Sequence, residues 1–200
     1  MRPNRVGGQV GEWIADYAKE HTDFSVGVAD LMKINLPLFN EPNHPRLQQY
    51  EHEQTKAWSK IVGAADAFII VTPEYNFTMP PSLNNAIDYL YHEWAYKPVG
   101  YVGYGGAGGG LRAIQTAQQL FTNVSAVSVP SPNSVALNEV FRPVTETFEP
   151  TEQHEQAADR MLAELHKWAV GLQTMRQQSH QDTYNTLSSC NGSGTVPSTF

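Results

Sequence analysis

The sequence has few of the residues that support secretion, membrane insertion or general nucleic-acid binding. Its single cysteine, Cys190, excludes an internal disulfide framework and a cysteine-based metal cluster. Apolar runs stay well short of the roughly 20 residues that a membrane helix requires, and no signal peptide is evident. Thirteen Lys and Arg against twenty Asp and Glu give a net charge of -7, which disfavours attraction to nucleic acid or anionic lipid. We therefore predict a cytoplasmic protein with no nucleic-acid or membrane partner.

The usual signatures of nucleophilic or metal catalysis are also missing from the sequence. It has no G-x-S-x-G elbow and no arrangement of Ser, His and Asp that suggests a triad. The histidines are scattered without metal-ligand spacing. We interpret these four as surface or helix-end residues: His44, His52, His92 and His154. The sequence therefore predicts no catalytic side chain and no metal site.

The composition fits one globular domain with a polar tail. The 200 residues are 40% hydrophobic and 16% charged, which is enough apolar material for one core. Residues 179–200 are instead rich in Ser, Thr, Gly and Asn and have no hydrophobic periodicity. We predict a domain over residues 1–178 and a disordered tail over residues 179–200.

Within the domain, helical and strand patterns alternate. Apolar residues recur at helical spacing in five segments, residues 6–21, 46–63, 80–91, 111–121 and 151–175. Short β-branched runs fall between them at residues 24–30, in the apolar run that ends at Pro73, and at residues 97–104 and 124–129. This alternation predicts an α/β fold with a doubly wound parallel sheet and helices on both faces. Ligands of such sheets bind beyond the carboxyl ends of the strands.

The loop after the buried strand is the first candidate site. Between Pro73 and the helix opened by Pro80, residues 74–79 leave backbone donors and acceptors available to a flat heterocycle, with Tyr75 beside them. An ordinary connecting loop, in which Tyr75 covers the core and Glu74 is solvated, explains the same residues. Composition alone leaves both interpretations open.

This region carries three distinctive strings, PEYN at 73–76, PPSLNNAIDYL at 80–90 and KPVGYVGYGGAGGGLRA at 97–113. Together, and in this order, they resemble the NADPH-dependent FMN reductase family, which includes quinone and azo-dye reductases. The resemblance implies a flavodoxin-like fold with FMN as cofactor. It also implies that hydride passes from NADPH or NADH through FMN N5 to a quinone, azo compound, metal ion or free flavin. The residues that would border the flavin ring are Pro73, Glu74, Tyr75 and Asn76.

The beginning of the sequence departs from the family pattern. The family opens with an apolar strand and a Gly-Ser-x-Arg loop around the FMN phosphate, whereas this sequence begins MRPNRVGGQVGEW. We expect the first strand of the flavodoxin-like sheet to be missing, which would expose the edges of its two neighbours. Arg2, Arg5 and the backbone at Val6 remain as candidate phosphate ligands at a helix N-terminus. A solvated, frayed N-terminus is the competing interpretation.

The glycine-rich loop at 105–110 is the second part of the expected flavin site. The resemblance places Gly105, Gly106 and Ala107 beside the flavin, where small residues leave room for a nicotinamide. Residues 103–108 also match G-x-G-x-x-G, a dinucleotide-binding fingerprint. That match is weak, because the fingerprint belongs to a first βα unit with an acidic residue about 20 positions further on.

The leading functional prediction is an FMN-dependent NAD(P)H oxidoreductase acting on a small-molecule electron acceptor. A non-catalytic flavodoxin-like module that has lost FMN is the alternative, and an NAD-dependent dehydrogenase is the weakest reading. We also predict a homodimer built around residues 81–91 and an aromatic group formed by Tyr91, Trp94 and Tyr96.

Overall fold

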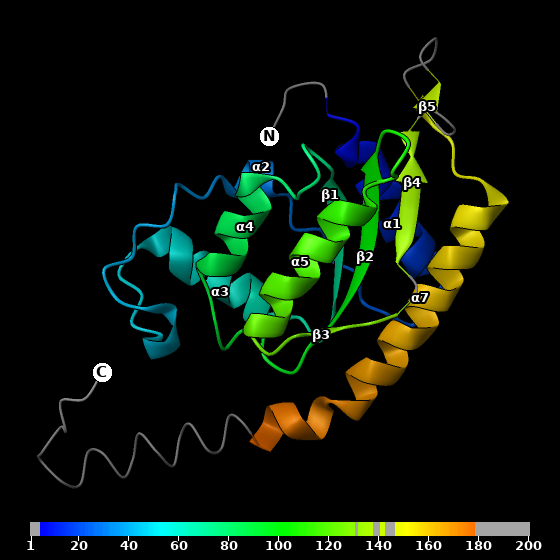
Figure 1. Ribbon diagram of the computed structural model, residues 1–200. Helices are drawn as coiled ribbons and strands as arrows, with labels where there is room; N and C mark the ends of the chain where they lie inside the picture. Colours follow the sequence, from blue (N-terminus) through cyan, green and yellow to red (C-terminus); the bar gives the residue numbers. More distant parts are fainter. Residues whose placement is uncertain (1–4, 131, 138–140, 143–146, 179–200) are drawn as a thin grey trace, which may run out of the picture.

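A parallel sheet lies at the centre of the computed structural model, which describes residues 5–130, 132–137, 141–142 and 147–178 (Figure 1). β2 is the middle strand; it pairs with β1 on one edge and with β3 and β4 on the other, in parallel throughout. The strands are β1 (Phe68–Pro73), β2 (Pro98–Gly105), β3 (Val127–Ser128) and β4 (Asn133–Ala136). A separate antiparallel pair joins β5 (Phe141–Arg142) to β6 (Thr147–Phe148).

Helices cover both faces of this sheet, which confirms the predicted α/β architecture (Figure 1). One face carries α1 (Gly7–His21) and α7 (Glu152–Gly171). The other carries α3 (Glu53–Ala64), α4 (Pro81–Asp88) and α5 (Leu111–Asn123). The long connection from α1 to α3 holds two short elements, α2 (Leu31–Ile34) and the 3-10 turn η1 (Pro45–Leu47). No helix in the described ranges is long and apolar enough to cross a membrane.

The core explains why β2 is apolar without interruption. All of its residues are buried, because helices pack on both of its faces. On one side Val102 packs with Val10 of α1 and Met161 of α7. On the other side Tyr101 packs with Phe121 of α5. The carboxyl end of β2 is thereby fixed between two helical layers.

The predicted helices form with modest changes at their ends. α4 begins at Pro81, as expected of a residue whose missing amide is not needed in a first turn. The helix predicted over residues 46–63 begins later, at Glu53. The preceding loop is held down by the buried carboxylate of Glu41, which accepts the backbone N–H groups of Glu51 and His52 at 2.8 and 3.1 Å. The strand predicted at 124–129 shortens to β3, and β4, which lies beyond that range, was not predicted.

Two predictions about individual segments are wrong. Residues 24–30 do not form a strand, because a strand needs a partner and none of the described residues pairs with this segment. Trp94 does not contribute to a surface aromatic group, since it is 2% exposed and packs against Trp58, Phe68 and Phe121. A dimer contact therefore cannot be centred on Trp94. The tail predicted at 179–200 lies outside the described residues.

Candidate functional site

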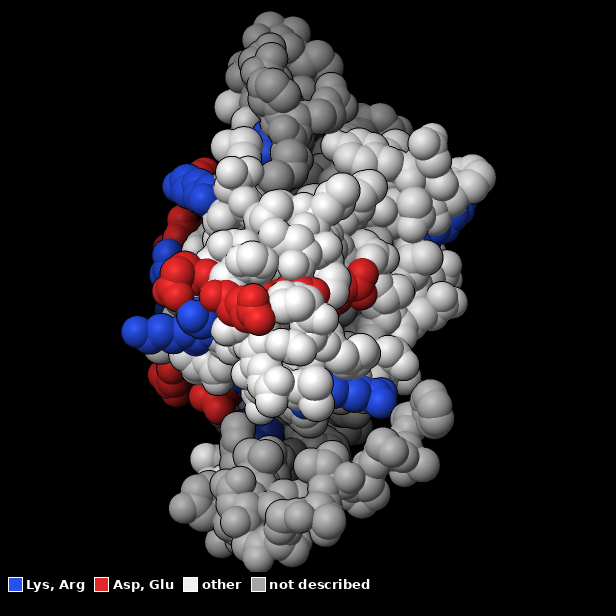
Figure 2. Space-filling model, turned by 90° about the vertical axis from the view of Figure 1, so that its left-hand side faces the viewer, with Lys and Arg blue, Asp and Glu red and all other residues white. Residues whose placement is uncertain are grey.

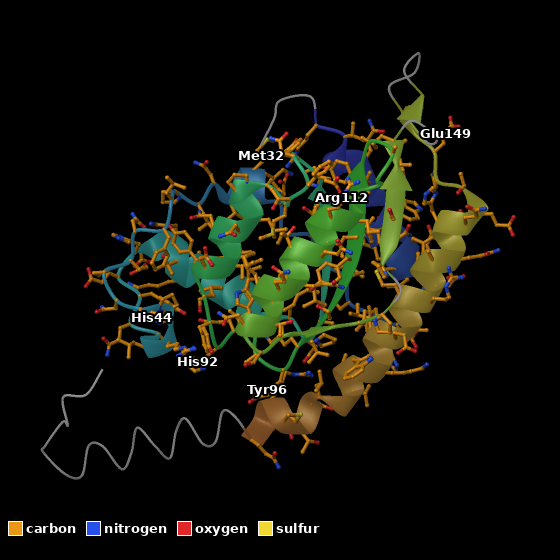
Figure 3. The ribbon with its side chains drawn as sticks, viewed as in Figure 1. Met32, His44, His92, Tyr96, Arg112 and Glu149 are labelled. Atoms are coloured by element: carbon orange, nitrogen blue, oxygen red, sulfur yellow. The ribbon has the colours of Figure 1, made fainter. Side chains whose placement is uncertain are left out.

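Three segments meet at the carboxyl end of the sheet: the turn after β1, the glycine-rich loop after β2 and the first turn of α1. The backbone N–H of Glu74 donates to the carbonyl of Tyr104 at 2.9 Å, which extends the pairing with β2 one residue past the end of β1. A Cβ on Gly7 would lie 2.2 Å from the Tyr104 hydroxyl oxygen, so α1 begins against the end of β2. Figure 3 shows Arg112, at the start of α5, at this same end of the molecule.

The turn after β1 is a tight hairpin with two residues at its tip. Tyr75 and Thr78 exchange backbone hydrogen bonds of 3.0 Å in each direction, while Asn76 and Phe77 have φ of 50° and 66°. Two successive left-handed residues are the signature of a type I′ turn. Asn tolerates this conformation, whereas it costs an ordinary L-residue about 1–2 kcal/mol. The side chains of Tyr75 and Phe77 are nonetheless 38% and 68% exposed.

Glu74 ties this hairpin to α5. Its carboxylate accepts the Arg112 guanidinium at 2.8 Å and the Arg112 backbone N–H at 3.0 Å. The side chain of Glu74 is only 10% exposed, so the interpretation of Glu74 as a solvated loop residue is wrong. Because its amide is used by Tyr104, Glu74 supports the loop instead of offering that backbone donor to a ligand. The guanidinium carbon of Arg112 also lies 4.1 Å from the centre of the Phe77 ring.

The glycine-rich loop is fixed at its C-terminal end, at Gly109 and Gly110, and exposed near its start, at Gly106 and Ala107. Gly110 has φ of 84°, and a Cβ there would lie 2.3 Å from the Tyr104 nitrogen, so a side chain is excluded. The carbonyl of Gly109 accepts the Val135 amide at 3.1 Å, which fixes the loop to β4. Gly106 and Ala107 are exposed, and a Cβ on Gly106 would meet nothing within 4 Å. This part of the loop is therefore open to solvent, while a Cβ on the neighbouring Gly105 would lie 3.3 Å from the Cβ of Glu74.

The first turn of α1 brings backbone donors to the same end of the sheet. Val6 occupies the N-cap position, no side chain of the described residues caps the helix, and the first turn holds no acidic residue. Arg5 is already engaged, because its guanidinium binds both carboxylate oxygens of Asp30, one at 2.8 Å. This hydrogen bonding lowers the pKa of Asp30 to about 2. Arg5 thus already has an acidic partner, and its contact with a phosphate stays a prediction; Arg2 lies outside the described residues.

The histidines play the structural roles predicted for them. The Nδ1 atoms of His44 and His154 accept backbone N–H groups at the starts of η1 and α7. Figure 3 shows His44 and His92 at the opposite end of the molecule from Arg112. Within the described ranges, no group of His, Cys, Asp or Glu side chains could hold a metal ion.

The sequence analysis did not identify three residues of this site: Asp30, Phe77 and Arg112. Asp30 ended a segment predicted as a strand, and nothing local linked it to Arg5. Phe77 offered one weak signal, an aromatic residue among the polar neighbours Asn76 and Thr78. Arg112 follows the glycine-rich loop directly, which placed it near the site without indicating its partner.

Loops gathered at the carboxyl ends of parallel strands, with helices on both faces, define a doubly wound α/β protein of the flavodoxin-like class. The chain belongs to the NADPH-dependent FMN reductase family, whose model matches residues 1–140. Among solved structures, the flavoenzyme NAD(P)H:(acceptor) oxidoreductase of Paracoccus denitrificans has a TM-score of 0.65 at 19% identity. That comparison covers 84% of this chain and 93% of the other.

Curated relatives extend the comparison. An NAD(P)H-dependent FMN reductase of Schizosaccharomyces pombe is 40% identical over 117 residues, which are 58% of each chain. An NADPH azoreductase of Bacillus sp. is 32% identical over 123 residues, 60% of this chain and 64% of the relative. The chain thus spans under two thirds of the length of these relatives.

Proposed function

We propose that the chain binds FMN where the three segments meet and acts as an NAD(P)H-dependent oxidoreductase. The hairpin at Pro73, Glu74, Tyr75 and Asn76 and the loop at Gly105, Gly106 and Ala107 would hold the ring. The uncapped amides around Val6 would receive the phosphate. FMN, when bound, supplies hydride and electron transfer between a nicotinamide and an acceptor. The protein then has to bind, orient and shield the reacting groups, which agrees with the absence of a triad from the sequence.

The observation that carries this proposal is that three features suited to a flavin lie at one end of the sheet. Gly106 is exposed and no atom stands within 4 Å of a Cβ built there, exposed aromatic rings lie on the hairpin after β1, and a helix N-terminus without an acidic first turn suits an anion. Arg5 would contribute by holding the start of α1 through Asp30. Direct phosphate contacts from Arg2 and Arg5 stay a prediction.

A planar aromatic electron acceptor fits this site best. The curated relatives include proteins named NADPH azoreductase and 2-hydroxy-1,4-benzoquinone reductase. Flat acceptors of this kind can stack on exposed rings with few polar contacts. We therefore propose a quinone or an azo compound as the acceptor class.

Filling the space beside Gly106 tests FMN binding directly. In a fluorescence titration, the wild-type protein should bind FMN, and Gly106→Leu should weaken that binding at least tenfold. Gly171→Leu is the matched control, because a Cβ at that position on α7 also meets nothing within 4 Å. Thermal melts of both variants should resemble the wild type. Equal FMN affinity in the wild type and Gly106→Leu would remove Gly106 from the site.

We further propose a homodimer and, because the sequence holds a single cysteine, a cytoplasmic location. Figure 2 views the side of the molecule that carries the loop between α2 and α3, and wide areas of it hold no charged side chain. Leu38 and Leu47 of this loop are 82% and 58% exposed. Phe39 of the same loop packs on Tyr89 at the end of α4, so the loop covers part of the helix from which a dimer contact was predicted. The loop thus replaces that helix as the proposed contact surface.

A further inference from the structure

The tip of the hairpin after β1 carries an aromatic residue in an unfavourable position. Phe77 has φ of 66°, a left-handed conformation that is unfavourable for a residue other than glycine, and its side chain is 68% exposed. The second tip residue of a type I′ turn is most often Gly, which adopts this conformation freely. A large ring at this position is therefore not explained by the turn.

The Phe77 ring is nevertheless held in place from one side. The guanidinium carbon of Arg112 lies 4.1 Å from its centre, as expected of a cation–π contact. Arg112 is in turn fixed by two hydrogen bonds to the carboxylate of Glu74, at 2.8 and 3.0 Å. One face of the ring thus rests on an anchored cation, and much of the ring's surface stays open. A ring that is already held loses little conformational freedom when a ligand stacks on it.

The residues that hold this ring also adjoin the glycine-rich loop. Glu74, which fixes Arg112, also contacts Gly105, and Arg112 approaches Gly108 of the same glycine-rich loop. Tyr75, at the base of the same hairpin, is 38% exposed. The Phe77 ring is thus connected, through Arg112 and Glu74, to the glycine-rich loop at the same end of the sheet.

We propose that Phe77 is a specificity-determining residue that stacks on the planar ring of the electron acceptor. This inference rests on the proposed function and adds the residue that selects flat aromatic acceptors. Arg112 and Glu74 act as positioning residues, since they orient the ring without needing to touch the acceptor. Aromatic rings pair by offset or edge-to-face stacking, which favours quinones over compact, non-planar oxidants.

A role in folding and a role in acceptor binding give opposite expectations for Phe77→Gly. Gly relieves the left-handed strain, so this variant should melt no lower than the wild type. If the ring served mainly to hold the hairpin through Arg112, the same variant should melt lower. Phe77→Tyr keeps a ring of the same shape and serves as the conservative control.

The experiment compares two electron acceptors with NADPH as donor. For 1,4-naphthoquinone and for ferricyanide, kcat/KM is measured in the wild type, Phe77→Gly and Phe77→Tyr, after FMN binding has been checked by fluorescence. We expect the ratio of naphthoquinone to ferricyanide kcat/KM to fall about tenfold in Phe77→Gly, through a raised KM for the quinone, and to stay within twofold in Phe77→Tyr.

Two results would overturn the assignment, and they differ from a failure of the proposed function. An unchanged ratio in Phe77→Gly would show that the ring does not select the acceptor. A lower melting temperature together with equal losses for both acceptors would show a structural role. Absence of FMN binding or NADPH oxidation in the wild type would instead defeat the proposed function, and the assignment of Phe77 with it.

Discussion

Arg5 shows how one side chain can meet a different partner from the one its sequence context suggests. Its position before α1 favoured a phosphate contact, but the fold brings Asp30 to it from 25 residues further on. The two side chains are 27% and 18% exposed, so this ion pair is better shielded than a typical surface pair. A bidentate ion pair of this kind fixes the relative orientation of the two side chains and also pairs their charges.

Replacing Arg5 by Ala should therefore lower stability. We expect the free energy of unfolding at neutral pH to fall by about 1–3 kcal/mol, the usual range for charged hydrogen bonds. The pKa of Asp30 lies at about 2, below its unfolded value, so the contribution is present above pH of about 4 and is lost as pH falls towards 2. Urea unfolding of the wild type and Arg5→Ala across this range checks both points. Equal stability at pH 7 would contradict the role given to the pair.

Asp30→Asn separates the structural role of Arg5 from phosphate binding. This variant breaks the charge pair but leaves the guanidinium in place. FMN affinity that is retained in Asp30→Asn and lost in Arg5→Ala would restore Arg5 as a phosphate ligand. Equal losses in both variants would confine Arg5 to holding the start of α1.

Lys97 provides a second prediction at the residue scale. Its buried ammonium donates to the carbonyls of Val62 and Gly63 at 2.8 and 3.0 Å. Burial lowers the pKa of Lys97 to about 8, with Arg176 adding to the effect and Asp66 and Glu93 opposing it. The folded state therefore binds fewer protons than the unfolded chain between about pH 8 and 10.4, and stability from this group rises with pH across that window.

Lys97→Met removes this dependence. The free energy of unfolding of the wild type, relative to the variant, should rise by about 1–3 kcal/mol between pH 8 and 10, since each pKa unit corresponds to 1.36 kcal/mol. Denaturant unfolding at several pH values measures the difference. A difference that stays constant across the window would mean that Lys97 keeps an ordinary pKa.

At the scale of secondary structure, local patterns predicted helices better than strand partners. α5 and α7 follow apolar periodicity that is complete within each segment, so the sequence was sufficient. Residues 24–30 have the composition of a strand, but a strand depends on a neighbour elsewhere in the chain. The same limit applies to the site. PEYN located the hairpin, whereas the Glu74–Arg112 contact joins residues that are 38 apart.

β1 carries the clearest prediction about an element. Among the described residues it is hydrogen-bonded along one edge alone, to β2, and Ile69 and Val71 are only half-buried. An apolar strand ending in Gly-Ser, fused before Met1, should pair with the other edge and bring new amides towards the phosphate site. We expect a higher melting temperature and tighter FMN binding together. If neither changes, another segment already covers this edge of β1.

For the whole molecule, the exposed apolar side chains of the loop between α2 and α3 predict self-association. Leu38, Leu47 and Phe39, all in this one loop, are 82%, 58% and 39% exposed. Light scattering at micromolar concentration should give twice the 22.2 kDa chain mass for the wild type. Leu38→Asp should shift the protein to the monomer without lowering its melting temperature. A monomeric wild type would contradict the proposed homodimer.

The central claim is that this fold positions FMN for reduction by a nicotinamide, and anaerobic spectroscopy tests it most directly. The protein is loaded with FMN, freed of unbound flavin and mixed with NADPH or NADH in the absence of oxygen. We expect the blue absorption of the flavin to bleach and to return when a quinone is added. A protein that retains FMN but shows no bleaching with either nicotinamide would be a flavin-binding module without reductase activity, and would contradict the proposed function.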